Sequence, residues 1–534
     1  MSLYAGSLRD DRVRDYLVPV RVVASEGIAS PEALVGKHCY QSYTGIREGD
    51  YQVMTAGSWL VVDFGREIAG GVRLTTGFKG GRVRIRFGES VSETMQTPNQ
   101  DHSIHDVELN LPKMGTTDFG STGFRFVRVD ALEGDLQLLG LNAVAVYHDY
   151  PQVGTFRCSD ERVNRVRDTA VYTVQLNMQD YIYDGVKRDR LVWLGDLNPE
   201  IRVILATFDH LELIPKSLDA VRDQTPLPAY MNSIMTYSAW WIINQRDYFL
   251  HTGDLDYLRQ QRDYLLGLLQ QFRPFVSDSG RLNLGDTWCF LDWPTNGNRD
   301  VQHAGGQGLF AMMFQAAETL CRALGETAAA DSSRDCHRRL LTHQPDCLGN
   351  KTAAAMLTLA GIRDCSDVLT ANPTAGVSTF YGYYMIKAQP VTSALRVIRD
   401  YWGAMLDFGA TTFWEDFDLD WIRNSNRIDE PPIPGKDDLH ADFGKYCYLG
   451  LRHSLCHGWA GGPAAWCINR VLGIRPLADG CRRVEVKPCL GDLAWAEGAM
   501  ALPDGGAVKV RVERRADGTL DMTIAAPDGV EIVR

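Results

Sequence analysis

The hydrophobic and polar positions along the chain follow three successive patterns. From about Val20 to Asp149, short segments alternate apolar and polar residues between Gly-rich turns, as in the stretches 59–64, 81–87 and 124–129. Period-two alternation with turns at this spacing predicts antiparallel strands packed as a β-sandwich, and the stretch 136–146 would close it.

After Pro151 the apolar residues recur at helical spacing. Ser159 is a candidate N-cap for the first helix. Further helical patterns lie around 200–210, 234–250, 255–272, 306–324, 351–360, 377–388, 392–402 and 460–471. Roughly ten to twelve paired helices in about 310 residues predict an (α/α)6 toroid. The long connections 276–296 and 416–438 are expected to carry function, because loops on a rigid scaffold often do.

A strand pattern returns from about Gly473 to the C-terminus. The segments 483–486, 507–512 and 522–524 are separated by Asp-Gly turn signals. The sequence therefore predicts a multidomain protein with a β-sandwich over 1–152, an (α/α)6 catalytic domain over 153–472 and a small β-domain over 473–534.

Composition narrows the functional class. A net charge of −12 without a basic stripe argues against nucleic-acid binding. No stretch approaches the roughly 20 apolar residues of a membrane span, and the N-terminus lacks the apolar core of a signal peptide. The twelve cysteines form no CxxC pair, which argues against a zinc site. Without an export signal they predict free thiols in a reducing cytoplasm.

The densest chemistry lies in YDGVKRDRLVWLGD, from Tyr183 to Asp196. Its charged and aromatic residues are Asp184, Lys187, Arg188, Asp189, Arg190, Trp193 and Asp196. A second acidic and aromatic segment, GATTFWEDFDLDW, carries Trp414 and Glu415. Sugar cleavage needs one carboxyl to protonate the leaving oxygen and another to activate water or attack. From spacing alone, surface loops with ordinary ion pairs are an equally good interpretation.

With these motifs in this order, the chain resembles the inverting α-L-rhamnosidases of glycoside hydrolase family 78, in their compact intracellular form. The likeness is carried by LVVDFGREIAGGVRL, DGVKRDRLVWLGD, GATTFWE, SLCHGWAGGPAAW and GIRPLADGCRRVEVKP, and it covers nearly the whole chain. The resemblance implies removal of terminal α-L-rhamnose from small rhamnosides by single-displacement inversion, without a cofactor or metal ion. It also suggests a homodimer.

The resemblance assigns roles by position. Asp189 takes the place of the general acid, and Glu415 takes the place of the general base. The remaining expected substrate-binding residues are Asp184, Arg188, Trp193, Asp196, Trp288, Trp293, Trp414 and His457. The aspartates would hold sugar hydroxyls, and the tryptophans would give the methyl group of a 6-deoxy sugar an apolar wall. Asp286 is expected at the base of the loop that carries Trp288.

One position departs from the family pattern, which usually has Glu as the general acid. No Glu lies between Tyr183 and Pro199, and Asp189 is one methylene shorter. Glu200 is the nearest substitute, although its place in a helical stretch makes it a poor one. Cations that point at Asp189 would favour its ionised form. We therefore expect Arg188 to turn towards Asp184 or Asp196.

Two other functions fit the same sequence. Another (α/α)6 exo-glycosidase, an unsaturated-uronyl hydrolase or a phosphorylase would need a basic pocket for a carboxylate or phosphate. A non-catalytic carbohydrate-binding relative is the other alternative, because Asp stands at the acid position. For His303, His440 and His453 the expected role is structural, and Trp240 and Trp241 are expected in a helix core.

Overall fold

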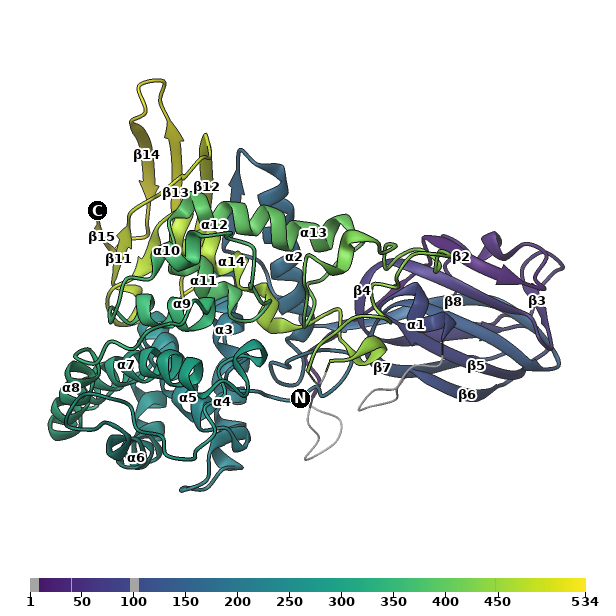
Figure 1. The fold of residues 1–534 in the computed structure, drawn as a ribbon. Coiled ribbons are helices and arrows are strands. Elements are labelled where there is room, and N and C mark those ends of the chain that lie inside the picture. Colours follow the sequence, from purple (N-terminus) through teal and green to yellow (C-terminus); the bar gives the residue numbers. More distant parts are fainter. Residues whose placement is uncertain (1–8, 40, 97–104, 447) are drawn as a thin grey trace.

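The computed structural model describes residues 9–39, 41–96, 105–446 and 448–534. The first eight residues, which belong to the N-terminal stretch expected to lack a signal peptide, lie outside the described part. A sheet-rich N-terminal region, a helical central region and a small C-terminal sheet region follow one another along the chain (Figure 1). The predicted fold class is confirmed. The domain limits near residues 152 and 472 stay predictions.

The N-terminal region is built on antiparallel strands in the order β1-β8-β4-β7-β5-β6, with β2 paired to β4 and β3 to β8. Their bounds are β1 (Val13–Leu17), β2 (Arg21–Glu26), β3 (Gln52–Thr55), β4 (Trp59–Thr76), β5 (Gly81–Gly88), β6 (Asp106–Leu111), β7 (Thr116–Glu133) and β8 (Asp135–Tyr147). The long strands β4 and β7 lose register between Asp63 and Ile68, where the sheet bends. Consecutive residues from Leu60 to Phe64 are buried, so both faces of β4 are covered there.

Short helical segments decorate this region. A 3₁₀ turn spans Pro31–Leu34, and α1 (Val91–Met95) follows β5 directly. Ser90 caps α1 by accepting a hydrogen bond from the Glu93 backbone N–H at 3.2 Å. The end of β5 and the start of α1 face the helical region, where Glu89 and Glu93 pair with Lys187.

The central region contains helices α2 to α14. Their bounds are α2 (Glu161–Asn177), α3 (Leu197–Thr207), α4 (Leu213–Asp223), α5 (Met235–Thr252), α6 (Leu255–Phe272), α7 (Arg299–Ala323), α8 (Thr327–Leu340), α9 (Lys351–Leu359), α10 (Ser366–Thr370), α11 (Gly382–Lys387), α12 (Val391–Val397), α13 (Gly403–Asp407) and α14 (Pro463–Trp466). Turns of π-helix at 398–402 and 467–471 continue α12 and α14.

The packing of each helix explains how closely its observed bounds match those predicted from the sequence pattern. Helix α6 has the bounds that the pattern predicts, because one clear apolar face alternates with a charged one. Helix α5 is buried almost all round, and Trp240 and Trp241 lie in the core as expected. The first helix is capped by Asp160 and not by Ser159: the Asp160 carboxylate accepts from the Arg162 and Val163 backbone N–H groups at 2.9 and 3.2 Å.

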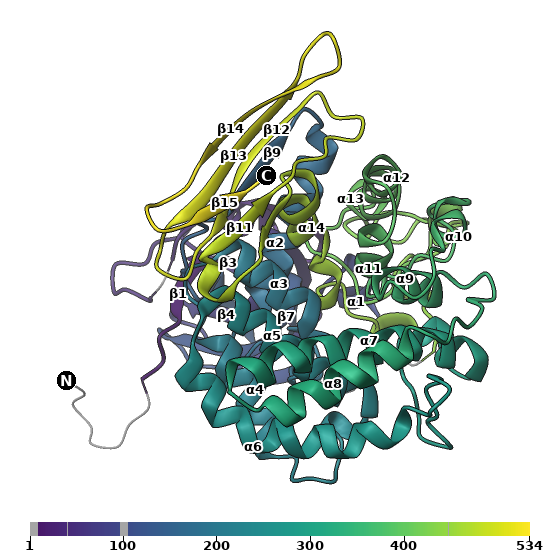
Figure 2. The ribbon, with the colours of Figure 1, turned by 90° about the vertical axis from the view of Figure 1, so that its left-hand side faces the viewer.

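The C-terminal region consists of two small sheets (Figure 2). One has the order β10-β11-β15, formed by β10 (Ile474–Pro476), β11 (Arg483–Val486) and β15 (Glu531–Val533). The other has the order β14-β13-β12-β9, formed by β14 (Leu520–Ala525), β13 (Ala507–Arg514), β12 (Trp495–Ala501) and β9 (Thr155–Cys158). Strand β9 directly precedes α2, so the start of the helical region is hydrogen-bonded into the C-terminal sheet.

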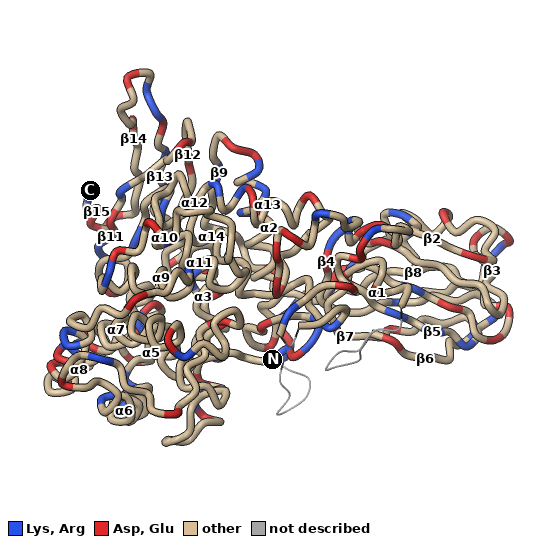
Figure 3. Tube along the Cα trace, viewed as in Figure 1, with Lys and Arg blue, Asp and Glu red and all other residues tan. Residues whose placement is uncertain are grey.

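Charges are spread over the whole molecule. Figure 3 shows acidic and basic residues interspersed along all three regions. Within the described residues, no helix is both long enough and apolar enough to cross a membrane. Arg125 links the first two regions: its guanidinium donates to both oxygens of Asp63 in the N-terminal region at 2.8 and 2.9 Å, and to the Gly409 carbonyl in the helical region at 2.9 Å.

Candidate active site

A pocket of about 270 Å³ collects the residues that the sequence singled out. Its walls come from the loop before α3, the loop before α7, the segment after α13 and the segment before α14. The predicted residues that line it are Asp184, Arg188, Asp189, Trp193, Asp196, Trp288, Trp293, Glu415 and His457. Pockets for drug-sized ligands usually measure about 300–1,000 Å³, so this one suits a single sugar ring.

Backbone hydrogen bonds bring the distant segments together. Gly185 and His457 form an antiparallel bridge, and the Gly458 N–H donates to the Asp184 carbonyl at 2.7 Å. The Glu415 N–H donates to the Ser454 carbonyl at 3.0 Å. Segment 454–458 is therefore a central strip that holds the first motif on one side and Glu415 on the other.

Arg188 joins the two predicted catalytic carboxylates. One terminal nitrogen lies 2.5 Å from both oxygens of Glu415, and the other lies 3.1 Å from Oδ1 of Asp189. Its Nε donates to the Arg452 carbonyl at 2.9 Å, which fixes the plane of the guanidinium. The expectation that Arg188 turns towards Asp184 or Asp196 is therefore wrong. The reason is that the fold places Glu415 opposite the first motif, and a buried carboxylate requires a cation.

This shared guanidinium also limits how far apart the two carboxyls are. Because its terminal nitrogens belong to one rigid planar group, an oxygen of Asp189 and an oxygen of Glu415 lie at most about 8 Å apart. An inverting glycosidase places its two carboxyls roughly 6.5–9.5 Å apart. The arrangement is thus compact enough for both groups to act on one sugar.

Asp189 stands on an unusual backbone turn. Asp189 and Arg190 both have φ near 52°, a left-handed backbone conformation that residues other than glycine rarely adopt. The Arg190 N–H donates back to the Arg188 carbonyl at 2.7 Å. The turn leaves the Asp189 side chain 21% exposed, whereas the Glu415 side chain is 2% exposed. Asp189 is therefore the more accessible of the two carboxyls and Glu415 the more enclosed.

Asp184 and Asp196 are buried acids at the side of the pocket. Burial first, and then the charge of Asp189, raises the pKa of Asp184 well above its usual value. Burial raises the pKa of Asp196 to about 8, although the Tyr237 hydroxyl that donates to it at 2.7 Å acts in the opposite direction. Each carboxyl is thus favoured in its neutral form, which both donates and accepts hydrogen bonds.

His457 lies between Glu415 and Asp184. Its Nε2 is 3.4 Å from Glu415 and 3.8 Å from Asp184, and its ring packs 4.1 Å from the Trp459 ring. Burial and the Arg188 charge lower the pKa of His457 well below its usual value. The ring is therefore neutral, with one nitrogen directed at the acids.

Aromatic side chains form the outer wall of the pocket. Trp193 meets Tyr237 edge-on, and Trp293 meets Phe290 edge-on with ring centres 6.2 and 5.1 Å apart. Trp288 is 44% exposed, and its indole nitrogen donates to Asn296 at 3.1 Å. An exposed indole face at the mouth is available to an apolar part of a ligand.

Two residues are not where the sequence predicts them. Trp414 is 1% exposed and is absent from the pocket wall within the described residues, because successive side chains of an extended segment point to opposite sides and Glu415 takes the pocket side. Trp414 instead packs edge-on against Phe417. Asp286 lies on the surface, where it faces Arg299 at 3.4 Å.

The pocket also contains residues that the sequence patterns did not single out. They are Asn232, Ile234, Tyr237, Phe290, Tyr448, Arg452 and Trp459. Asn232 has φ of 53° just before α5, and its side chain accepts from the Leu194 N–H and donates to the Val192 carbonyl. A polar Asn before an apolar helix is a recognisable turn signal. Arg452 is an isolated cation, and the others are apolar or aromatic residues that are common in cores, so none of them carries such a signal.

Glu200 lies directly below the pocket, in the first turn of α3. It is fully buried, and neither carboxyl oxygen has a hydrogen-bond partner among the described residues. Burial raises its pKa well above the usual value. A Cβ added at Gly458 would lie 2.2 Å from its carboxyl group, so this glycine allows the strip 454–458 to pass over α3.

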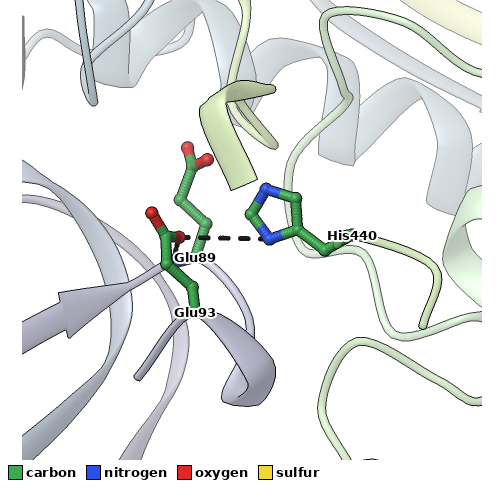
Figure 4. Close-up of side chains that lie close together, drawn as sticks. All are labelled: Glu89, Glu93 and His440. Atoms are coloured by element: carbon green, nitrogen blue, oxygen red, sulfur yellow. Dashed lines mark hydrogen bonds and ion pairs between the residues drawn. The ribbon is translucent and has the colours of Figure 1, made fainter. Parts of the chain in front are cut away.

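A buried charge cluster lies behind the loop that carries Lys187 and Arg188, at the junction with the N-terminal region. Figure 4 shows Glu89, Glu93 and His440 converging there. Their ligand atoms lie within 4.8 Å of one another, which is close enough for a metal ion. The Lys187 ammonium group already supplies the positive charge, at 2.8 Å from Glu93 and 3.4 Å from Glu89.

The hydrogen bonds of His440 also favour the ammonium group over a metal ion as the cation of this cluster. Its Nε2 faces the His453 carbonyl at 2.8 Å, so that nitrogen carries the hydrogen, and Nδ1 accepts from the Ser90 hydroxyl at 2.7 Å. Both ring nitrogens are therefore used. The expected structural role fits His440.

Glu89 connects this cluster to Glu415. Its carboxylate accepts from the Ser454 hydroxyl at 3.1 Å and from the Leu455 N–H at 2.6 Å. The Ser454 N–H in turn donates to Oε2 of Glu415 at 3.0 Å. One carboxylate of the N-terminal region thus holds both Lys187, which precedes Arg188, and the strip that supports Glu415.

Comparison with known proteins identifies related sequences along the chain. Three family models match consecutive segments: the bacterial alpha-L-rhamnosidase concanavalin-like domain at residues 54–147, the 6 hairpin glycosidase domain at 151–342 and the C-terminal domain at 473–533. An alpha-L-rhamnosidase of Streptomyces avermitilis is 22% identical over 522 residues, covering 88% of this chain and 47% of its own length. The chain spans less than half the length of the curated relatives it matches.

Solved structures share the fold. A GH78 family rhamnosidase of Bacillus sp. GL1 superposes with a TM-score of 0.73 at 22% identity, covering 94% of this chain and 55% of its own. A rhamnosidase from Klebsiella oxytoca with rhamnose bound superposes with a TM-score of 0.68 at 21% identity, covering 86% of this chain and 96% of its own.

Proposed function

Because the chain belongs to the family of bacterial α-L-rhamnosidases, we propose that it is an exo-acting α-L-rhamnosidase that releases terminal rhamnose from small rhamnosides by inversion. The observation that carries the proposal is a pocket for one sugar in which Asp189 and Glu415 share a single guanidinium. The S. avermitilis relative bears the same activity in its name, and the K. oxytoca structure contains rhamnose.

The proposed reaction has one displacement step. Asp189, the more accessible carboxyl, gives its proton to the glycosidic oxygen as the bond from that oxygen to C1 breaks. A water molecule attacks C1 from the opposite face and gives its proton to Glu415. The products are the free aglycone alcohol and rhamnose with the opposite anomeric configuration.

The remaining pocket residues would hold the sugar. Asp184 and Asp196 offer neutral carboxyl groups, and His457 offers a neutral ring, so all three can bond to hydroxyls without adding charge. Rhamnose carries a methyl group at C6, and Trp193 and Phe290 provide apolar surface for it. Apolar surface here excludes water from the methyl group, which favours a 6-deoxy sugar.

The charge of the pocket argues against the rival enzyme class. A uronate or phosphate substrate needs spare positive charge, but the Arg188 guanidinium is already paired with the buried Glu415. Asp184 and Asp196, which are favoured in their neutral forms, add no positive charge to the pocket wall. A neutral sugar therefore fits better than an anionic one.

Hydrolysis of an aryl α-L-rhamnoside tests the proposal. The wild-type chain should release the phenol, and Asp189→Asn and Glu415→Gln should each lower kcat at least about 10³-fold. A matched control is Asp286→Asn, a surface carboxyl outside the pocket, which should keep wild-type kcat. Binding of rhamnose without turnover by the wild-type chain would instead make it a non-catalytic relative.

We also propose that the enzyme works in the cytoplasm as a homodimer. The cysteines in the described part of the chain are all free thiols, and all but Cys489 are buried, which suits a reducing compartment. Light scattering on the purified chain measures the second part directly: a mass near twice 59.6 kDa is expected, and a mass of 59.6 kDa would contradict it.

A further inference from the structure

A second cavity, of about 320 Å³, lies between the helical region and the C-terminal sheets. It is bordered by α3, α5, α11 and the π-turn at 467–471 on one side and by β10 and β12 on the other. Helix α5 carries Tyr237 in the active-site pocket and Arg246 in this cavity. At 1.5 Å per residue the two positions are about 13 Å apart along the helix, so the cavity is separate from the active site.

Basic side chains outnumber acidic ones in the lining of this cavity. They are Arg202, Arg246, Lys387, Arg470 and Arg475. Among the described lining residues, Asp247 is the one carboxylate. Asp247 is already shared by Arg202 at 2.6 Å and Arg246 at 2.8 Å, and Arg475 pairs with Glu485 outside the cavity.

Lys387 and Arg470 have no acidic partner. Neither forms an ion pair or a hydrogen bond with any residue in the described ranges; the Lys387 ammonium group only lies 5.1 Å from the centre of the Tyr383 ring. Nε of Arg470 and Nε of Arg202 are buried and likewise lack an acceptor in this part of the chain. Buried donors without acceptors cost free energy, and a charged donor costs more than a neutral one.

Repulsion between the positive charges of these side chains adds to this free-energy cost. Burial, and then the charge of Arg202, holds the pKa of Lys387 well below its usual value. Burial and the charge of Arg475 lower the pKa of Arg470. A cavity in which cations repel one another and donors lack acceptors is complementary to an anion.

We propose that this cavity binds a tetrahedral oxyanion, namely a phosphate group that is either free or carried by a small molecule. Guanidinium and ammonium groups are the usual protein ligands of phosphate, because they match its charge and supply several donors. The apolar part of the lining, which includes Leu205, Trp466 and Met500, leaves room for a small organic group beside the phosphate. The inference does not depend on the proposed reaction.

Calorimetric titration of the full chain tests this site. Inorganic phosphate and a hexose 6-phosphate are titrated separately, with acetate at matched ionic strength as the control for screening. Saturable binding near one site per chain is expected for at least one phosphate compound and not for acetate. Tighter binding of the free ion or of the hexose phosphate tells which source the site prefers.

Two variants separate the site from general charge effects. Lys387→Met and Arg470→Gln, singly and together, remove cations that have no partner, so the unfolding midpoint in phosphate-free buffer should stay the same or rise. Phosphate affinity should fall at least about tenfold in the double variant. The control Arg259→Gln removes an exposed cation on α6 that pairs with Asp256 at 2.6 Å, and should leave affinity unchanged.

Two results would overturn the proposal. One is the absence of saturable binding of both phosphate compounds up to about 10 mM, which is weaker than any specific site of this charge should be. The other is equal phosphate affinity in the wild-type chain and in a folded Arg470→Gln or Lys387→Met variant.

Discussion

At the residue scale, the four acids of the candidate site differ in their electrostatic environment. Glu415 is buried and neutralised by Arg188, whereas Asp184 and Asp196 are buried without a cation and hold their protons. Asp189 touches the same guanidinium but is the most exposed of the four. Four similar carboxyl groups can therefore take different roles.

The raised pKa of Asp196 predicts a pH dependence of stability. The unfolded chain releases this proton near the usual value of 3.8, while the native state keeps it up to about pH 8. The stabilising effect of this group is therefore complete below about pH 4 and is lost as the pH rises to about 8, and it amounts to at most about 6 kcal/mol.

Chemical denaturation at several pH values measures this effect. Between pH 5 and 8 the free energy of unfolding should fall more steeply for the wild-type chain than for Asp196→Asn. Asp286→Asn, which changes an exposed carboxyl, should follow the wild-type slope. Parallel curves for the wild-type chain and Asp196→Asn would show that Asp196 ionises normally.

Sequence reasoning found most of the site residues because their motif places acids, bases and a tryptophan within a few positions. It could not find the partner of Arg188, since that depends on how the fold brings residue 415 across from residue 188. It placed Trp414 in the wall because a single motif does not tell which side of the segment faces the pocket. Tyr237 and Tyr448 were missed because their residue types are equally common in cores.

At the element scale, β5 and α1 of the N-terminal region meet the loop that carries Lys187 and Arg188 in a buried junction. Glu89 and Glu93 follow β5 and project towards the helical region. Both pair with Lys187, and Glu89 also accepts from the Leu455 N–H in the strip 454–458. Lys187 also donates to the carbonyls of Leu451 and His453 at 2.7 and 3.0 Å. The N-terminal region thus helps to hold Arg188 and Glu415 in place.

This junction predicts that Glu89 is a positioning residue for Glu415 and Arg188. Glu89→Gln keeps the side-chain shape but removes the charge that faces Lys187. We expect kcat to fall at least about tenfold while KM stays within about twofold, because the sugar contacts remain and only the alignment of the acids changes.

Glu26→Gln is the control for Glu89→Gln. Glu26 is a Glu of the same region that lies outside the charge cluster and accepts a hydrogen bond from the Trp59 indole N–H at 3.0 Å. It should keep wild-type kcat. If both variants lost kcat equally and in step with a lower unfolding midpoint, Glu89 would have only a general structural role. Hydrogen exchange of the Ser454 and Leu455 amides, expected to be faster in Glu89→Gln, gives an answer that does not require activity.

At the scale of the whole molecule, the three regions are linked through shared hydrogen-bonded elements. Strand β9 continues the C-terminal sheet and leads directly into α2, and Arg125 bonds to both Asp63 and Gly409. The sequence predicted the three regions well because the apolar period changes from two to about 3.6 and back. It could not predict that β9 pairs with β12, since partners more than 300 residues apart leave no local pattern.

This linkage predicts a cooperative loss of structure when β9 is damaged. Phe156 is 1% exposed, so Phe156→Ala should lower the free energy of unfolding by about 3–5 kcal/mol. Arg157→Ala on the opposite face of β9 removes an exposed ion pair with Asp168 and should cost about 1 kcal/mol or less. Calorimetry should show one transition that shifts as a whole for Phe156→Ala. A C-terminal transition that melts separately would show that the regions are independent.

The most direct test of the central claim is the configuration of the first product. Proton NMR of the wild-type chain acting on an aryl α-L-rhamnoside follows the anomeric signal during the first minutes, before mutarotation. Direct attack of water held by Glu415, with Asp189 as the acid, predicts that β-L-rhamnose appears first and α-L-rhamnose only later. Initial release of α-L-rhamnose would require a covalent intermediate on one carboxyl, and would contradict the roles given to both residues.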